Sequence, residues 1–213
     1  MTDYIYDPCG VVEVEAVPMA PRVRSLQSLR LGVLSNTKWN AAKLLRATVR
    51  ELADQGLTFT SVTYYDKHHF SSDANVDLIS QIAVENDVAL TAIGDCGSCC
   101  SACVNDAVRL EEAGLPTVVI VTTEFEHEAR LQRESRGMAG LQPAVATHPI
   151  SSLTLEQLDG RAAEIAPQAR RIWSGDAVSL ARVSADVHDY AGLGGNLRTL
   201  VADMGSDIRS FAR

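Results

Sequence analysis

Four cysteines of this chain lie within one short stretch, at Cys96, Cys99, Cys100 and Cys103. Cys96 and Cys99 have C-x-x-C spacing, at which two sulfur atoms can act as a dithiol/disulfide redox pair or as a nucleophile with its resolving thiol. Thiolates also bind soft metals, so Cys96, Cys99 and Cys103 form an alternative ligand set for zinc, copper or an iron–sulfur cluster. Cys100 and Cys103 can equally be small buried hydrophobic residues, as free cysteines often are. The stretch therefore predicts redox, nucleophilic or metal chemistry centred on Cys96.

The residues on either side of the cysteines predict a strand, a turn and a helix. The apolar run at residues 88–93 is typical of a buried strand, and the helical pattern that follows ends at Gly114 and Pro116. The cysteines then occupy the start of the helix, where free N–H groups and the helix dipole stabilise an anion. A thiol in that place ionises more readily, and Ser98 is positioned to cap the helix. Cys96, at the end of the strand, is the predicted reactive thiol.

Strands and helices alternate along most of the chain. Strands are predicted at residues 29–35, 58–64, 88–93, 117–121 and 143–148, and helices at 41–55, 77–86, 125–133 and 155–173, besides the helix after the cysteines. This order predicts an α/β fold that is doubly wound, Rossmann-like or flavodoxin-like, with a mostly parallel sheet of about five strands and helices on both faces. The sequence contains neither a GxGxxG fingerprint nor a Walker sequence.

Polar side chains that follow these strands are expected to meet the cysteines at one rim of the sheet, where open α/β folds bind ligands. Asn36 and Lys38 follow the first strand and are candidates to bind a substrate carboxylate or phosphate. Thr122 and Glu124 follow the fourth strand and are further substrate-binding candidates, although Glu124 can also serve as an acid/base or as a charge at a helix N-terminus. His148 is expected as a base or proton donor beside Cys96, or as a hydrogen-bonded loop histidine.

Asp95 directly precedes the predicted nucleophile and is the remaining candidate catalytic residue. Its charge would raise the pKa of the thiol, so a lysine or the helix dipole must offset it. The favoured function is a thiol-dependent enzyme in which the Cys96 thiolate attacks an electrophilic or oxidised small-molecule substrate and Cys99 resolves the adduct as a disulfide.

Two other functions stay open at this point. The first is a metal-binding protein or metalloenzyme that holds zinc, copper or an iron–sulfur cluster at Cys96, Cys99 and Cys103, with His148 or an exogenous ligand completing the site. The second is a non-catalytic redox-sensing or partner subunit. Only the metal alternative requires a cofactor.

Several segments together resemble a known family. GDCGSC, followed by EEAGLPTVVIVTTEF, resembles the UGSC-type family, in which the first cysteine of the motif can be replaced by selenocysteine. DPCG, VPMAPRV, LSNTKWNA and THPI occur in the same order as in that family, so the resemblance extends from about Tyr6 to Trp173. It implies a redox or nucleophilic role at Cys96. The strand–cysteine–helix arrangement is also similar, more distantly, to the selenoprotein subunit of glycine-type reductases.

The composition limits the class of protein and its partners. A formal net charge of −8 and a pI near 5.1 argue against nucleic acid and against an anionic membrane surface. The sequence has no apolar run long enough to span a membrane and no signal peptide, so a cytoplasmic location is expected. Clustered thiols in that compartment are more often reactive or metal-bound than structural disulfides.

The chain is predicted to comprise three parts. Residues 1–28 form an N-terminal arm, residues 29–173 form the α/β domain, and residues 174–213 form a C-terminal helical extension with an apolar stripe. Such a stripe usually docks on its own domain or on a sister subunit, so the extension is expected to assemble a homo-oligomer or hetero-oligomer. At 213 residues, the chain is long enough to bury an ample core without disulfides.

Overall fold

A computed structural model of the chain describes residues 14–175. The chain divides into two units, Met1–Asp176 and Ala177–Arg213, and the architecture below belongs to the first. Cys9, the first part of the predicted arm and nearly all of the predicted C-terminal extension lie outside the described residues. The expectation that the extension assembles subunits therefore stays a prediction.

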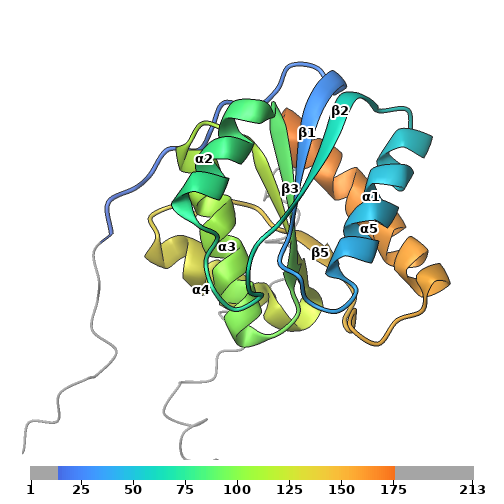
Figure 1. Ribbon diagram of the computed structural model, residues 1–213. Helices are drawn as coiled ribbons and strands as arrows, with labels where there is room; N and C mark the ends of the chain where they lie inside the picture. Colours follow the sequence, from blue (N-terminus) through green and yellow to red (C-terminus); the bar gives the residue numbers. More distant parts are fainter. Residues whose placement is uncertain (1–13, 176–213) are drawn as a thin grey trace, which may run out of the picture. The chain divides into compact units, whose positions relative to one another are not determined.

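The described residues form five strands that alternate with five helices, as predicted from the sequence (Figure 1). The strands are β1 (Gln27–Ser35), β2 (Thr58–Asp66), β3 (Val88–Gly94), β4 (Thr117–Thr122) and β5 (Ala144–Ala146). The helices are α1 (Ala41–Asp54), α2 (Val76–Glu85), α3 (Gly97–Glu112), α4 (Glu126–Ser135) and α5 (Leu155–Ser174), and a 3-10 turn, η1 (Thr123–Phe125), precedes α4.

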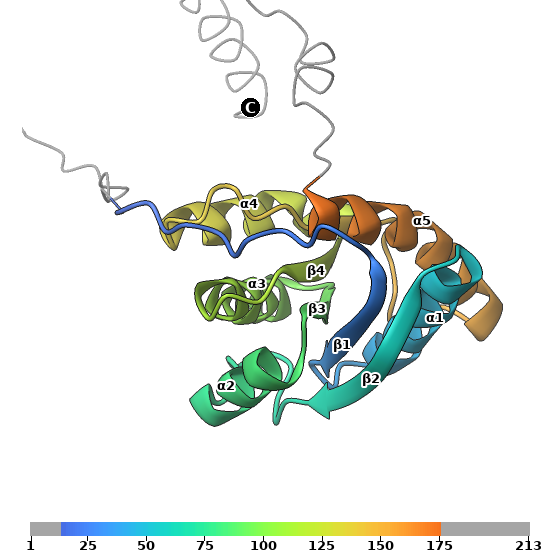
Figure 2. The ribbon, with the colours of Figure 1, turned by 90° about the horizontal axis from the view of Figure 1, so that it is seen from above.

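The five strands form one parallel sheet in the order β2-β1-β3-β4-β5. This is the flavodoxin-like order, which confirms the predicted doubly wound α/β fold. Helices α1 and α5 cover one face of the sheet, and α2, α3 and α4 cover the other (Figures 1 and 2). From β1, the chain adds β2 on one side and then β3, β4 and β5 on the other, so the direction of winding changes between β1 and β3. The loops after those two strands border the crevice where such sheets bind ligands.

The central strands are covered on both faces of the sheet, which explains why their sequences are mainly apolar. Every residue of β3 and β4 is buried, so neither strand shows the polar alternation of a half-exposed strand. One large apolar cluster fills the space between the sheet and the α1–α5 layer, and Trp173 is fully buried within it. The indole N–H of Trp173 donates to the carbonyl of Ala89 at 3.0 Å, which ties the end of α5 to the middle of the sheet.

The described part of the N-terminal arm is held by one buried carboxylate at the far end of α3. Glu111 Oε2 accepts hydrogen bonds from the Ala20 N–H at 2.9 Å and from Arg22 Nη2 at 2.5 Å. Its other oxygen accepts from the Thr117 N–H at 2.8 Å, at the start of β4. The described part of the arm is therefore tied to the end of α3 and the start of β4, and the first strand begins at Gln27 and not at residue 29.

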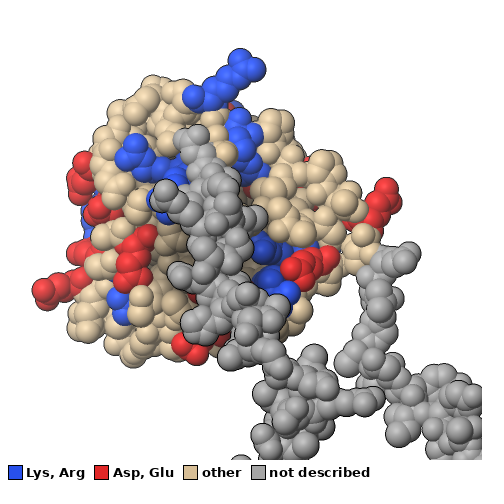
Figure 3. All heavy atoms as spheres, turned by 180° about the vertical axis from the view of Figure 1, so that it is seen from behind, with Lys and Arg blue, Asp and Glu red and all other residues tan. Residues whose placement is uncertain are grey.

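Charges of both signs are interspersed over the face shown in Figure 3, wherever the described residues are visible. The sequence as a whole has 27 acidic and 19 basic residues. Within residues 14–175, the structure contains no helix that is both long and apolar enough to cross a membrane.

Candidate active site

The strand–turn–helix unit at β3 and α3 brings Cys96 and Cys99 together. Cys96 is the N-cap residue of α3, with extended backbone, and Cys99 lies in the first turn. Their Cα atoms are 5.4 Å apart and their sulfur atoms are paired as a disulfide. Cys96 is partly exposed at the rim, whereas Cys99 is fully buried beneath it. The predicted cap at Ser98 is not formed, because Cys96 and not Ser98 holds the N-cap position and makes no side-chain cap bond.

Two hydrogen-bond donors converge on the buried sulfur of this pair. Lys38, in the turn after β1, donates from Nζ to Cys99 Sγ at 3.3 Å. The backbone N–H of Asp95 donates to the same sulfur, also at 3.3 Å. Positive charge and an aligned amide both favour the thiolate form of a cysteine, so the surroundings of Cys99 are suited to a negative charge.

Asp95 supplies the counter-charge to Lys38 and is anchored by the loop after β5. Its Oδ2 lies 3.8 Å from Lys38 Nζ and accepts a hydrogen bond from Ser151 Oγ at 2.6 Å. Its Oδ1 is buried, accepts no hydrogen bond from the described residues, and lies 3.0 Å from His148 Nδ1. Lys38 is therefore one group that can offset the charge of Asp95 beside the thiols, the helix dipole being the other that was expected.

His148 reaches the site through Asp95. Besides its contact with Asp95, Nδ1 lies 3.1 Å from Thr122 Oγ1, and Thr122 in turn donates to the carbonyl of Gly94 at 3.3 Å. The hydrogen bonds and ion pairs of the His148 ring within residues 14–175 include none to a sulfur atom. A direct Cys96–His148 pair therefore stays a prediction, and the observed contacts of His148 are with Asp95 and Thr122.

Two asparagines shape the turn after β1. Asn36 is fully buried, and its amide donates to the carbonyl of Ile93 at 3.0 Å and to Cys103 Sγ at 3.3 Å, while Oδ1 accepts from the Lys38 N–H at 3.2 Å. Its polar atoms are thus engaged within the fold, where Asn36 positions the backbone of Lys38. The contact of Asn36 with a substrate stays a prediction.

Asn40 fastens this turn to the loop that carries Ser151. Its amide donates to the carbonyls of Ile150, Ser151 and Leu153 at 3.0, 3.3 and 3.0 Å. Asn40 has a positive φ of 67°, a left-handed conformation that asparagine tolerates better than most residues. Neither Asn40 nor Ser151 was identified as a site residue from the sequence. Asn40 bonds to a segment more than a hundred positions away, and Ser151 bonds to Asp95 from a separate loop, so no local pattern indicates either contact.

Cys100 and Cys103, the other two thiols of α3, are fully buried. Burial raises the pKa of each to about 12, and the charge of Glu128 adds to the effect at Cys100. Cys100 Sγ donates to the carbonyl of Phe125 at 3.5 Å. Both thiols pack in one apolar cluster between α3, α4 and β4, which agrees with the prediction that they are buried hydrophobic residues.

The metal alternative finds little support in this geometry. A cysteine binds a metal ion as its thiolate, and the burial of Cys103 opposes the ionisation of its thiol. Within residues 14–175, no three side chains of His, Cys, Asp or Glu are grouped so that they could hold a metal ion.

In flavodoxin, whose sheet has the same strand order, FMN binds at the switch point between β1 and β3. At that place in this chain, Lys38 from the β1 side contacts both the sulfur of Cys99 and the carboxylate of Asp95 from the β3 side. These side chains therefore bridge the crevice between the two strand ends.

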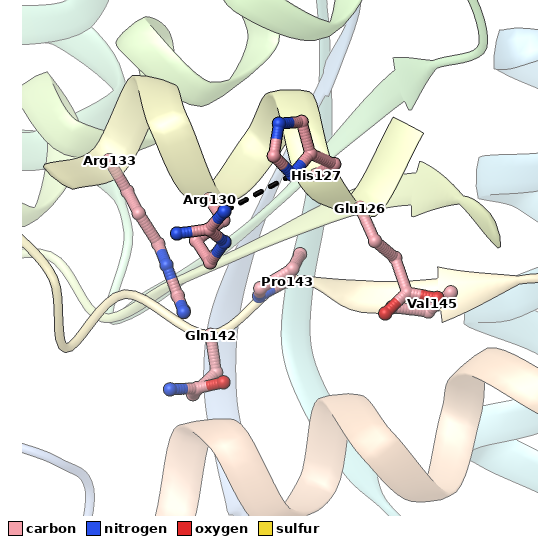
Figure 4. Close-up of a pocket in the computed structure, with 7 residues that line it drawn as sticks. All are labelled: Glu126, His127, Arg130, Arg133, Gln142, Pro143 and Val145. Atoms are coloured by element: carbon pink, nitrogen blue, oxygen red, sulfur yellow. Dashed lines mark hydrogen bonds between the residues drawn. The ribbon is translucent and has the colours of Figure 1, made fainter. Parts of the chain in front are cut away.

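The remaining predicted residue, Glu124, lies exposed on η1 at the same rim. A separate hollow of about 360 Å³ lies between α4 and β5, where Arg133 extends from α4 toward Gln142 (Figure 4). Its lining residues are Glu126, His127, Arg130, Arg133, Gln142, Pro143 and Val145, and they include none of the predicted site residues. The candidate active site is therefore defined by the surroundings of the two sulfurs and not by this hollow.

The fold and the site together define a flavodoxin-like α/β domain that carries a C-x-x-C pair where its third strand meets the following helix. The UGSC family model matches residues 4–175, and the chain belongs to the UGSC family. No curated protein matches the sequence.

Solved structures of flavodoxin type are similar to this chain at low sequence identity. A diflavin flavoprotein A3 from Nostoc sp. has a TM-score of 0.36 and 10% identity, over 70% of this chain and 97% of that one. A short-chain flavodoxin associated with a non-canonical PDU bacterial microcompartment has a TM-score of 0.35 and 12% identity, over 68% and 99%. A flavodoxin-like domain from Synechococcus sp. gives 0.35 and 12%, over 72% and 99%. The assignment of the fold rests on the order and direction of the strands.

Proposed function

We propose that this UGSC-family chain is a thiol-dependent enzyme that carries out redox chemistry on a small molecule, with Cys96 as the nucleophile and Cys99 as the resolving thiol. One observation carries the proposal. The two cysteines are close enough to form a disulfide at the start of α3, and only Cys96 is accessible from the rim. An outside molecule can meet the sulfur of Cys96, whereas Cys99 is placed to react with Cys96 alone.

The reaction balances in two steps. The Cys96 thiolate attacks the electrophilic atom of an oxidised substrate, such as one sulfur of a small disulfide, and the group that leaves takes the electron pair of the broken bond. The Cys99 thiolate then attacks Cys96 Sγ, which forms the Cys96–Cys99 disulfide and releases the second part of the substrate with its electron pair. The substrate gains two electrons and the protein loses two, so a thiol reductant must restore the dithiol.

Asp95 and His148 are the proposed proton-handling groups of this reaction. The Nδ1 atom of His148 faces Asp95, which leaves Nε2 as the ring atom that can pass a proton to a leaving group at the rim. Asp95 lies beside the ring and is itself held by Ser151. Of the four proposed substrate contacts, only Glu124 is exposed on this rim, since Asn36 and Thr122 are buried and Lys38 points to Cys99.

A thiol count and an elemental analysis on protein purified without oxygen test the proposal. The reduced protein should contain less than about one metal per chain, and a mild oxidant should remove two thiols and link Cys96 to Cys99, as peptide mass mapping can show. Zinc, copper or iron bound tightly at one equivalent or more would favour the metal alternative. A reduced protein that forms no such disulfide would contradict the roles given to both cysteines.

A further inference from the structure

The two sulfurs of the Cys96–Cys99 pair have very different surroundings. Around Cys99, Lys38 Nζ and the Asp95 N–H each donate to the sulfur at 3.3 Å. Around Cys96, the side-chain contact within the described residues is a long one of 3.9 Å to Ser98 Oγ. The accessible sulfur thus lacks the two donors that the buried sulfur has. An arrangement built only to activate Cys96 as a nucleophile would have the opposite asymmetry.

We infer that Lys38 is a positioning residue that, with the Asp95 N–H, stabilises Cys99 as the leaving thiolate when a thiol reductant opens the disulfide by attack on Cys96. This inference rests on the proposed function and adds to it the direction of the regenerating step and the chemical class of the reductant, a small thiol or dithiol. It also moves Lys38 from the predicted role of substrate contact to a role at the sulfur.

The step balances as follows. A reductant thiolate attacks Cys96 Sγ from the exposed side and forms a mixed disulfide, the Cys96–Cys99 bond breaks, and its electron pair stays on Cys99. A second reductant thiolate then attacks the reductant's own sulfur in the mixed disulfide and releases Cys96 as a thiolate. A leaving thiolate of lower basicity leaves faster, so the donors at Cys99 accelerate the first attack and direct it to Cys96.

The charges that face Cys99 come from each element packed around it. Lys38 approaches from the turn after β1, Asp95 from the end of β3, and His148 from the loop after β5 through its contact with Asp95. Asp95 draws Lys38 toward itself at 3.8 Å, and Ser151 fixes the carboxylate in that place. Lys38 therefore lies between the carboxyl group of Asp95 and a sulfur that becomes negative only when the disulfide opens.

Mapping the first adduct tests where the reductant attacks. The oxidised protein is mixed briefly with glutathione, quenched in acid, alkylated and analysed by peptide mass mapping. We expect glutathione on Cys96 and the alkyl group on Cys99. Glutathione found mainly on Cys99 would overturn the inference while leaving the proposed function intact, because that function requires only that the disulfide forms. This measurement uses the wild-type protein, so it does not depend on any variant folding.

The rate of reduction tests the part played by Lys38. Reduction of the disulfide by dithiothreitol should be about tenfold slower in Lys38→Met, and Lys38→Arg should recover most of the rate because it keeps the positive charge. Lys43→Met is the matched control, since Lys43 lies near Trp39 and Asn40 Oδ1 and makes no contact with the pair. Unchanged kinetics in a folded Lys38→Met would contradict the inference.

A titration of the single thiol separates a charge effect from a merely structural one. In Cys96→Ser, the ultraviolet thiolate absorbance of reduced Cys99 should rise at a lower pH than that of an ordinary cysteine. Adding Lys38→Met should move this rise to higher pH, and adding Asp95→Asn should move it to lower pH because Lys38 is then freed from its counter-charge. A rise at the same pH in all three proteins would overturn the role of Lys38.

Discussion

Helix α3 and its N-cap carry two pairs of cysteines that differ in their bonding and in the polarity of their surroundings. Cys96 and Cys99 lie at its start, joined as a disulfide and next to Lys38 and Asp95. Cys100 and Cys103 lie within one turn of them but face an apolar cluster, and burial raises the pKa of both to about 12.

The difference teaches that position on the helix decides the chemistry of a thiol more than the motif around it. Cys99 and Cys100 are neighbours in the chain and both are fully buried. Because successive residues of a helix point about 100° apart, Cys99 faces the polar crevice between β1 and β3, whereas Cys100 faces α4. Burial alone therefore does not decide the chemistry of a cysteine: Cys99 is buried next to a lysine and a backbone N–H, whereas burial raises the pKa of Cys100 and Cys103 to about 12.

The sharpest test of this comparison is the formation of the disulfide. Cys96→Ser should abolish closure of the intramolecular disulfide by a mild oxidant and abolish activity, whereas Cys100→Ser should leave closure intact because its sulfur faces away from the pair. Peptide mass mapping of oxidised protein measures both. The alternative of a cluster held by all the thiols predicts equal losses, so a Cys100→Ser protein that is as inactive as Cys96→Ser would contradict the comparison.

Alkylation should separate the two pairs by a large factor in the reduced wild-type protein. A thiol with a pKa of about 12 is ionised to the extent of only about one part in ten thousand at a pH near 8, and only the thiolate reacts. We expect iodoacetamide to label Cys96 first and to label Cys100 and Cys103 about a thousandfold more slowly. Time-resolved peptide mapping measures the rates. Labelling of all four thiols at similar rates while the protein stays folded would show that the buried pair is not protected.

Each thiol pair has a lysine nearby, Lys38 or Lys67, and replacing each lysine by methionine should affect a different property of the protein. Lys67, whose charge acts on Cys103, forms a buried ion pair with Asp106 at 2.5 Å, and both side chains are almost completely buried. Lys67→Met should lower the free energy of unfolding by about 3–5 kcal/mol, because it leaves the Asp106 carboxyl buried without its partner. Lys38→Met should cost less stability and instead slow disulfide reduction.

Denaturant unfolding measures the first effect, and the double variant Lys67→Met with Asp106→Asn is its control. The double variant should recover part of the loss, since a neutral amide replaces the uncompensated carboxylate. A Lys67→Met protein as stable as the wild type would mean that the ion pair contributes nothing to the fold.

The last expected effect is on stability at alkaline pH, and it develops only gradually as the pH rises. The folded pKa of Cys103, about 12, lies above the ordinary cysteine value of about 8.5, so between these pH values the folded protein keeps a proton that the unfolded chain releases. The contribution is complete below about pH 8.5 and is lost as the pH rises toward 12, on the order of a few kcal/mol in total.

Cys103→Ser is the comparison for this alkaline decline, because a serine does not titrate in the range. The variant should be less stable at neutral pH by about 1–3 kcal/mol and should lose less stability than the wild type as the pH rises. Unfolding curves at several pH values give both slopes. Parallel slopes would show that Cys103 is not protected from ionisation in the folded protein.

Much of this protein was determined by the sequence alone. The fully buried β3 and β4 appear in the sequence as mainly apolar runs, and the helix between them ends shortly before Gly114 and Pro116 for local reasons of backbone conformation. The C-x-x-C spacing likewise brings two sulfurs within bonding reach without any help from the rest of the chain. These features depend on residues a few positions apart, so the local pattern was enough to predict them.

Only the tertiary structure decided which groups surround each sulfur. Lys38 meets Cys99 across 61 positions of sequence, and Ser151 meets Asp95 across 56. The sequence predicted that Lys38 contacts a substrate and that His148 acts beside Cys96, whereas the contacts seen in the structure are those of Lys38 with Cys99 and of His148 with Asp95. Contacts of this kind depend on how loops cross the carboxyl edge of the sheet, and a loop residue carries no periodic pattern to show what it will touch. The physical reason is that the order of strands and helices along the chain determines which residues reach the carboxyl edge of the sheet. The packing of separate loops then determines which hydrogen bonds and charges surround the thiols at that edge.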